Sequence, residues 1–472
     1  MQGYFESKEF KENLAYFEES RKKGESVFLD SDQLTDIAEY YHWMGRSDEA
    51  LEVADYALSI FQGATSPLVL KSRIALLVDN DPEKAMALAE EIVDKFDLDY
   101  YYIKAEIMIV TNKADQADLY LETCSEQVDD EEYDDYLLDV ATLFTDYEQT
   151  VYAKKWLERS VEIDLPDYRE QLGRIRYFEK DYEDSIRIFE ELADESPYNT
   201  FYWDMLACSQ LAMGRLGDTL TSSEFAIAIN PNDESALLYK GQALMRMKDY
   251  DAAIPYFDRH GKIRPSNVDG PINSALCHIY LGDYRDGVAL LQQAEDAAER
   301  YCPERKWEVY QEEAFAYSQF NDLGRALSYI DKMETLKDND PDESMVLRGH
   351  LYLEHFRPAQ AHECFKKAIE HSHYSCTIMM RIAVSLYDND YIKSAYDMLK
   401  NFTPNDLAAL PQTYAYLAIS AHDLGHHDEY LEYLRLAVEK SPSAARTVLA
   451  PLFPDEMETS EYYNYAIKEH HQ

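Results

Sequence analysis

SPYNTFYWDMLACSQLAMGRLGDTLTSSEFAIAINP (residues 196–231) is followed directly by NDESALLYKGQALMRMKDYDAAIPYFDRHGKIRP (residues 232–265). The same pattern of residues repeats in both stretches, and its closing prolines are 34 residues apart, at Pro197, Pro231 and Pro265. A small residue precedes each proline by 24 positions: Gly173, Ala207 and Gly241. A fixed period of this size indicates one supersecondary unit stacked many times, instead of a globular domain around a single core.

Each unit reads as a hairpin of two short helices. In residues 167–197, Leu172, Ile175 and Phe178 form one apolar stripe at helical spacing, and a second stripe ends at Leu192. Pro197 then closes the unit, because proline cannot continue a helix. Neither amphipathic helix could hold its apolar face in water alone, so we expect each hairpin to be buried against the next.

A pair of small or short residues twelve positions apart marks the expected crossing of the two helices, as at Gly173 and Ser185. The pair recurs at Ala38/Ala50, Ala105/Ala117, Ala141/Ala153, Ala207/Thr219, Gly241/Ala253, Ala275/Gly287, Ala314/Ala326, Gly349/Ala361 and Ala383/Ala395. Ala418 opens a last copy, and residues 67–98 fit a further, irregular one. The sequence therefore predicts about twelve hairpins.

The expected organisation has four parts. Residues 1–30 form an N-terminal capping helix, 31–295 and 296–442 form two runs of repeats, and 443–472 form a C-terminal cap. One spacer, from Ala275 to Ala314, is 39 residues long instead of 34 or 35. It predicts either a lengthened hairpin or a joint between two stacks.

The recurring residues resemble the tetratricopeptide repeat family. One copy carries Trp203, Leu206, Ala207, Gly214, Ala226 and Pro231; the next carries Leu237, Gly241, Ala253, Phe257 and Pro265. The resemblance covers nearly the whole chain and implies an all-α, right-handed superhelical solenoid. It also implies that the first helices of the hairpins line a concave groove that binds an extended peptide or a helix.

The charge limits the classes of partner. Lys and Arg number 45 against 91 Asp and Glu, so the net charge is −46. Such a surface repels phosphate backbones, so neither nucleic acid nor an anionic membrane is expected to bind. A basic partner is favoured, although the charge could instead serve mainly to keep a long surface soluble and monomeric, or only weakly oligomeric.

The sequence also predicts the compartment. The six cysteines are widely spaced, as in proteins of a reducing compartment. MQGYFESKEF lacks a basic and apolar leader, and the longest apolar runs are too short to cross a bilayer. We therefore expect a soluble cytoplasmic protein.

No catalytic motif is visible, so we expect neither an enzyme nor a cofactor. The nucleotide-binding G-x-G-x-x-G and P-loop patterns, the G-x-S-x-G elbow and H-E-x-x-H are all missing from the sequence. Two clusters suggest metal binding but are expected not to bind one: the soft ligands His362, Cys364, His371, His373 and Cys376, and the acidic run Asp129, Asp130, Glu131, Glu132, Asp134 and Asp135. A helix separates the soft ligands, and the acidic run lacks the calcium-loop spacing.

The candidate groove positions are the residue just after each small residue and the one three before it. In the first half they are polar and mixed: Tyr102, Glu106, Glu170, Arg174, Asp204 and Gln242. In the second half they are mostly apolar, with Gln311 and His350 as exceptions: Ile272, Leu276, Phe315, Val346, Met380, Val384, Ala415 and Ile419. The second half therefore predicts a groove suited to an amphipathic helix, unless a tighter superhelix or the chain's own C-terminal segment covers it.

Together these patterns predict a non-enzymatic scaffold or adaptor that binds a protein or peptide partner in a concave groove. The alternative is a regulatory or sensor subunit that binds a signal peptide and controls a partner enzyme.

Overall fold

The computed structural model describes residues 2–5, 7–129, 131–161, 163–337, 339–454 and 457–470. Its internal contacts divide the chain into two compact units, unit 1 (Met1–Gly270) and unit 2 (Pro271–Gln472). The boundary expected from the sequence between the two runs of repeats, at residues 295 and 296, stays a prediction.

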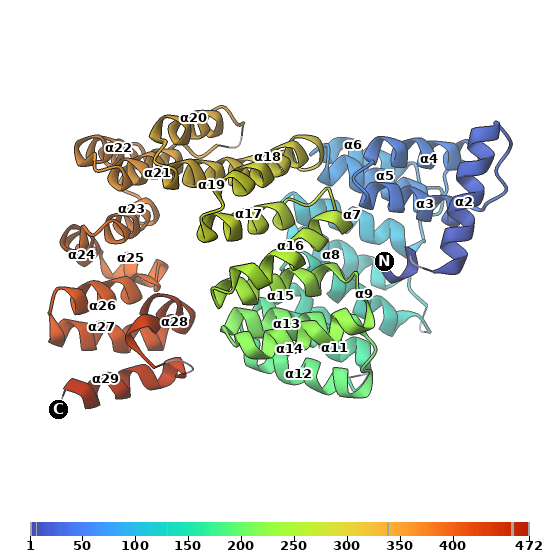
Figure 1. Ribbon diagram of the computed structural model, residues 1–472. Coiled ribbons are helices and arrows are strands. Elements are labelled where there is room, and N and C mark those ends of the chain that lie inside the picture. The colour runs from blue at the N-terminus through green and yellow to red at the C-terminus, as the bar shows by residue number, and fades with distance from the viewer. Residues whose placement is uncertain are drawn as a thin grey trace. The chain divides into compact units, whose positions relative to one another are not determined.

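Unit 1 begins with two helices, α1 (Gln2–Phe5) and α2 (Lys8–Lys23), and continues as seven antiparallel hairpins (Figure 1). These are α3 (Ser31–Trp43) with α4 (Ser47–Ile60), α5 (Thr65–Leu77) with α6 (Pro82–Glu90), α7 (Leu98–Val110) with α8 (Ala114–Ser125), α9 (Tyr133–Asp146) with α10 (Thr150–Leu157), α11 (Pro166–Phe178) with α12 (Tyr182–Glu195), α13 (Thr200–Met213) with α14 (Leu216–Ile229), and α15 (Glu234–Arg246) with α16 (Tyr250–Ile263).

Unit 2 contains five more hairpins and a C-terminal cap. The hairpins are α17 (Asp269–Leu281) with α18 (Tyr284–Tyr301), α19 (Lys306–Gln319) with α20 (Leu323–Glu334), α21 (Pro341–Glu354) with α22 (Pro358–His371), α23 (Cys376–Asp388) with α24 (Ile392–Lys400), and α26 (Thr413–Asp423) with α27 (His427–Lys440). A short helix, α25 (Pro404–Ala409), precedes the last hairpin, and α28 (Pro442–Leu449) and α29 (Tyr462–His470) follow it. The described residues thus confirm an all-α solenoid of about twelve hairpins.

The small residues are required where the two helices of a hairpin cross. A Cβ added to Gly173 would lie 2.7 Å from the ring of Phe189, and one added to Gly241 would lie 2.6 Å from Phe257. Gly349 faces Phe365 in the same way, at 2.3 Å. In all three hairpins the glycine and the phenylalanine are 16 residues apart, so one close-packed contact is repeated in both units.

The turn inside every hairpin contains one residue with positive φ. The twelve positions are Gly45, Asn80, Asn112, Glu148, Lys180, Gly214, Lys248, Gly282, Asn321, Phe356, Asp390 and Gly425. Only four of them are glycine, the residue that adopts this conformation without steric cost. The repeated backbone geometry therefore persists where the residue type gives no sign of it.

The 39-residue spacer is a lengthened hairpin. Its second helix, α18, runs for 18 residues, and a short 3-10 turn (Pro303–Arg305) leads into α19. Of the two interpretations that the sequence left open, the structure bears out this one.

Both ends of the solenoid are closed by short helices. Phe10 and Phe17 of α2 are buried against the first hairpin. In unit 2, α28 and α29 pack against α27, and the ring of Phe453 stacks on Tyr462 at 3.9 Å. These segments shield the outer faces of the terminal hairpins, as terminal units of a solenoid must.

The first and last hairpins of unit 1 line a common cavity. It has a volume of about 270 Å³ and is lined by Phe5, Tyr40 and Trp43 near the N-terminus and also by Asn232 and Ile263. Asn232 precedes α15 and Ile263 ends α16, so the seven hairpins of unit 1 bring their two ends together.

Candidate functional site

The polar groove residues predicted for unit 1 lie on its first helices, and several of them tie neighbouring helices together. Glu106 on α7 is buried and accepts hydrogen bonds from Arg73 Nε at 2.8 Å and Tyr147 Oη at 2.7 Å. Arg174 on α11 forms an ion pair with Asp146. These two side chains therefore hold the solenoid together, whereas Gln242 is half-buried on α15.

Six carboxylates on the first helices form what we call the acidic band: Asp36, Glu39, Asp99, Asp139, Glu170 and Asp204. Burial raises the pKa of each, and repulsion by at least one neighbouring carboxylate raises it further. Asp99 contributes to the raised pKa of both Glu39 on α3 and Asp139 on α9, so carboxylates from three helices face one another.

The members of the band differ in accessibility. Asp99 and Asp139 are exposed, although the oxygen of Asp139 accepts a hydrogen bond from Tyr102 Oη at 3.0 Å. Glu39 and Glu170 are half-buried. A ligand can therefore reach the exposed pair directly, and the half-buried carboxylates add negative potential behind it.

Asp204 is the most strongly perturbed member of the band. Burial, followed by the nearby carboxylate of Asp233, raises its pKa to about 9. Asp233 is the N-cap residue of α15, and its Oδ1 accepts a hydrogen bond from the backbone N–H of Ala236 at 3.1 Å. The raised pKa therefore favours the protonated form of Asp204 at neutral pH, and a nearby cation would favour its ionised form.

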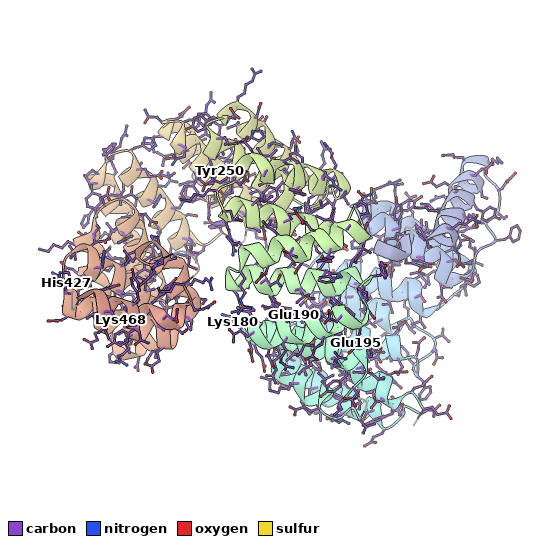
Figure 2. The ribbon with its side chains drawn as sticks, turned by 60° about the horizontal axis from the view of Figure 1, so that its bottom comes forward. Lys180, Glu190, Glu195, Tyr250, His427 and Lys468 are labelled. Carbon is purple, nitrogen blue, oxygen red and sulfur yellow. The ribbon has the colours of Figure 1, made fainter. Side chains whose placement is uncertain are left out.

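The cations nearest the band are engaged elsewhere. Arg73, between α3 and α7, is held by Glu106, and Arg174 is held by Asp146. By contrast, on the second helix α12 (Figure 2), Glu190 is exposed to solvent, and Glu195 pairs with Arg169 Nη1 at 2.7 Å. Arg73 still acts to lower the pKa of Glu39 and Asp99, and Arg174 that of Glu170, so these two cations offset part of the negative charge of the band.

The apolar groove residues predicted for unit 2 fall into two groups. Phe315, Val346, Met380 and Val384 line a single cavity of about 420 Å³, together with Gln311 and His350. We call it the α19–α26 cavity, because helices from α19 to α26 contribute to its walls. Ile272 is buried and Leu276 half-buried on α17, and both lie outside this cavity, as do Ala415 and Ile419, which are buried on α26.

The cavity is partly covered by its own hairpins. Val346 and Met380 are buried, whereas Phe315 and Val384 are half-buried and remain accessible. Among the described residues, the C-terminal helices α28 and α29 contribute none to the lining of the cavity. The cavity therefore has an accessible apolar lining and a buried apolar floor.

One end of the cavity is polar. His350 Nδ1 lies 3.0 Å from Ser385 Oγ, and His350 Nε2 lies 3.5 Å from Glu354 Oε1. Burial acts to raise the pKa of Glu354, but hydrogen bonds from His350 and Ser318 outweigh it and lower that pKa. At the rim, Arg381 Nε pairs with Glu343 Oε1 at 2.8 Å. These groups satisfy one another and fix the shape of the cavity.

The metal candidates of the sequence are placed apart or otherwise bonded. His371 Nδ1 lies 2.8 Å from Asp342 Oδ1, and Asp134 Oδ2 accepts a hydrogen bond from Ser160 Oγ at 2.7 Å. Asp130 of the acidic run lies outside the described residues. Within the described ranges, no three His, Cys, Asp or Glu side chains converge as metal ligands would.

The spacing rule covers three of the six carboxylates of the acidic band: Glu39, Glu170 and Asp204. Of these, Glu39 directly follows Ala38 and fits the rule, but it was not among the predicted groove residues. Asp36 and Asp139 each lie two positions before a small residue, a position that the rule did not include. The position two before each small residue lies on the same face of the first helix. A rule that included this position would have found both Asp36 and Asp139.

The fold and the recurring contacts define a tetratricopeptide-repeat protein, of a fold that typically mediates protein–protein interactions. Residues 179–294 match the family model of the anaphase-promoting complex, cyclosome, subunit 3. No protein with a curated description is significantly similar to the chain. No helix in the described part of the chain is long and apolar enough to cross a membrane.

Solved structures with similar backbones are repeat proteins of low sequence identity. A tetratricopeptide repeat protein from Parabacteroides merdae is 18% identical, with a TM-score of 0.42 over 54% of this chain and 98% of its own. Yeast Tom70 is 12% identical, with a TM-score of 0.45 over 93% and 96%. The anaphase-promoting complex assembly Cut9–Hcn1 is 13% identical, with a TM-score of 0.35 over 93% and 90%.

Proposed function

We propose that this protein is a non-enzymatic adaptor that binds a protein or peptide partner on the first-helix faces of its hairpins, and that the acidic band recognises a basic segment of that partner. The observation that carries the proposal is the band itself. Its carboxylates have raised pKa values, and the cations beside them are already paired. Lys or Arg side chains of a partner would supply further positive charge.

The net charge of −46 supports the same partner chemistry at long range. It would speed the encounter with a basic segment and slow the encounter with an acidic one. The α19–α26 cavity offers a separate contact for apolar side chains, in keeping with the amphipathic helix predicted from the sequence. The wide cysteine spacing fits a cytoplasmic setting.

The proposal is tested by fluorescence anisotropy with a labelled octalysine peptide and the full chain. We expect binding at low salt and at least about tenfold weaker binding at roughly 0.2 M salt. The double variant Asp99→Asn, Asp139→Asn removes two accessible carboxylates of the band and should weaken binding further, to about a tenth of the original affinity.

The matched control is Glu190→Gln, Asp194→Asn, which removes two exposed charges from the second helix α12. It should leave the affinity within about twofold of the original chain. Equal losses in the two double variants would show that net charge alone attracts the peptide, and the band would then not be the recognition element.

A further inference from the structure

A second recess in unit 2 lies on the other side of the hairpins, between second helices. The helices α22 and α24 both flank α23, and α22 packs far less closely on the following hairpin than α12 does on α13. The gap between them is a cleft of about 540 Å³, which we call the α22–α24 cleft. It shares no lining residue with the α19–α26 cavity, so it is independent of the first-helix faces discussed above.

The cleft has an apolar floor and a polar rim. Leu353, Phe365 and Ile382 are buried and form its base. Leu386 and Met398 are half-buried along its sides. Along α22 the lining residues recur every three to four positions from Pro358 to Glu370, which spans about 18 Å at 1.5 Å per residue.

Two nitrogen-bearing side chains stand at the rim of the cleft. His362 and Lys366 are one helical turn apart on α22, and both are exposed. Lys366 Nζ lies 3.9 Å from Glu370 Oε1, an exposed ion pair that contributes little.

The volume of the cleft suits a small ligand. Sites for small molecules commonly have volumes of about 300–1,000 Å³ and are mostly apolar with a few polar groups. An alkyl or aromatic chain with one charged end matches the α22–α24 cleft on both counts.

We propose that the α22–α24 cleft binds an amphiphilic carboxylate, with its apolar chain over Phe365 and Ile382 and its carboxylate between His362 and Lys366. The apolar chain would displace water from the half-buried side chains of Leu386 and Met398 along the cleft. The carboxylate would accept a charge-assisted hydrogen bond from Lys366 and a second hydrogen bond from His362.

The test uses isothermal titration of the full chain with dodecanoate and with dodecyltrimethylammonium, both below their micelle concentrations. The two probes have the same tail and opposite head charges. Non-specific attraction to a chain of net charge −46 favours the cationic probe, whereas the cleft requires the anionic one. We expect one dodecanoate per chain, bound at least about tenfold more tightly than dodecyltrimethylammonium.

Two variants locate the site. Ser394→Trp places a large ring at the rim of the cleft and should abolish dodecanoate binding. Lys366→Gln should weaken it by about tenfold. Lys367→Gln, whose side chain pairs with Glu363 outside the cleft, should change it by less than about twofold. Circular dichroism checks that each variant keeps its helices.

Three results would overturn the proposal. They are equal or tighter binding of the cationic probe, equal losses in the Lys366 and Lys367 variants, and unchanged dodecanoate binding in Ser394→Trp. If neither amphiphile binds, the proposal is wrong. None of these results bears on the acidic band, because the band lies in unit 1, whereas the α22–α24 cleft lies in unit 2.

Discussion

Unit 1 and unit 2 use the same hairpin to present opposite surfaces. The residue directly after the small residue of a first helix is Glu106 in α7 and Phe315 in α19. In unit 1 this face carries the acidic band, and in unit 2 it carries the apolar α19–α26 cavity. The comparison teaches that the backbone repeat sets where a partner can bind, and that single positions within the repeat decide what chemistry it meets.

If the two units share one architecture, truncating the equivalent core side chain should lower the free energy of unfolding by the same amount in each unit. We expect Phe257→Ala in unit 1 and Phe365→Ala in unit 2 each to lower the free energy of unfolding by about 3–5 kcal/mol, because each empties the site facing a glycine. Hydrogen exchange resolved by unit measures both. A large effect in one unit and a small one in the other would show that the glycine–phenylalanine contact does not stabilise the two units equally.

Replacing Glu106 by an apolar residue tests whether this groove residue also joins neighbouring helices. Glu106→Leu gives unit 1 the apolar residue type found in unit 2, but it also leaves Arg73 and Tyr147 without their acceptor. We expect a loss of about 1–3 kcal/mol in denaturant unfolding. Leu276→Glu, at the equivalent half-buried position of unit 2, serves as the reverse exchange. A Glu106→Leu variant as stable as the original would show that Glu106 is not a tie between helices.

Each unit also contains a carboxyl group whose pKa is raised well above its usual range, and in unit 2 Glu312, next to Glu313, is a second case, because burial and Glu308 raise its pKa to about 7. Burial and Asp233 raise the pKa of Asp204 to about 9, and burial and Glu295 raise that of Glu313 to about 8. In the unfolded chain both ionise near pH 4, so stability falls as the pH rises from about 4 towards these values.

We therefore expect Asp204→Asn and Glu313→Gln each to raise the free energy of unfolding at pH 8 by at least about 1 kcal/mol, and with it the melting temperature. At pH 4 we expect little effect of either substitution. Thermal unfolding by circular dichroism at the two pH values measures this. Equal effects at both pH values would attribute the change to packing and not to ionisation.

The smallest expected effect concerns a hairpin turn. Phe356 is 91% exposed and has a φ of 56°, a conformation that costs a bulky residue energy. Phe356→Asn keeps the turn and removes part of that cost, so we expect stabilisation of up to about 1 kcal/mol. The same residue type already occupies the equivalent turn at Asn321, which serves as the reference. Destabilisation would show that the exposed ring makes a contact of its own.

The sequence predicted the hairpins because their crossings require particular residues. Gly173, Gly241 and Gly349 are small because a phenylalanine lies against each, and that need is visible as a fixed spacing. The turns are different. Glu148, Lys180 and Phe356 adopt the left-handed conformation because the hairpin imposes it, and this conformation could not be predicted from their residue types.

The candidate surfaces were predictable only in part. Phe315, Val346, Met380 and Val384 were found together because a run of apolar residues at matching positions stands out. Which of them stay accessible depends on how closely neighbouring hairpins approach, and residue type does not fix that distance. The α22–α24 cleft was missed for the same reason, since it arises where two hairpins fail to pack closely.

The shared cavity between the ends of unit 1 constrains how this protein can evolve. Repeat proteins ordinarily gain and lose whole repeats, because each one touches only its neighbours. Here Trp43 in the first hairpin and Ile263 in the seventh line one cavity, so the two ends are matched to a fixed number of hairpins. Duplication or deletion of a 34-residue repeat within unit 1 would separate them, and lineages of this protein should therefore vary in repeat number within unit 2 before they do so in unit 1.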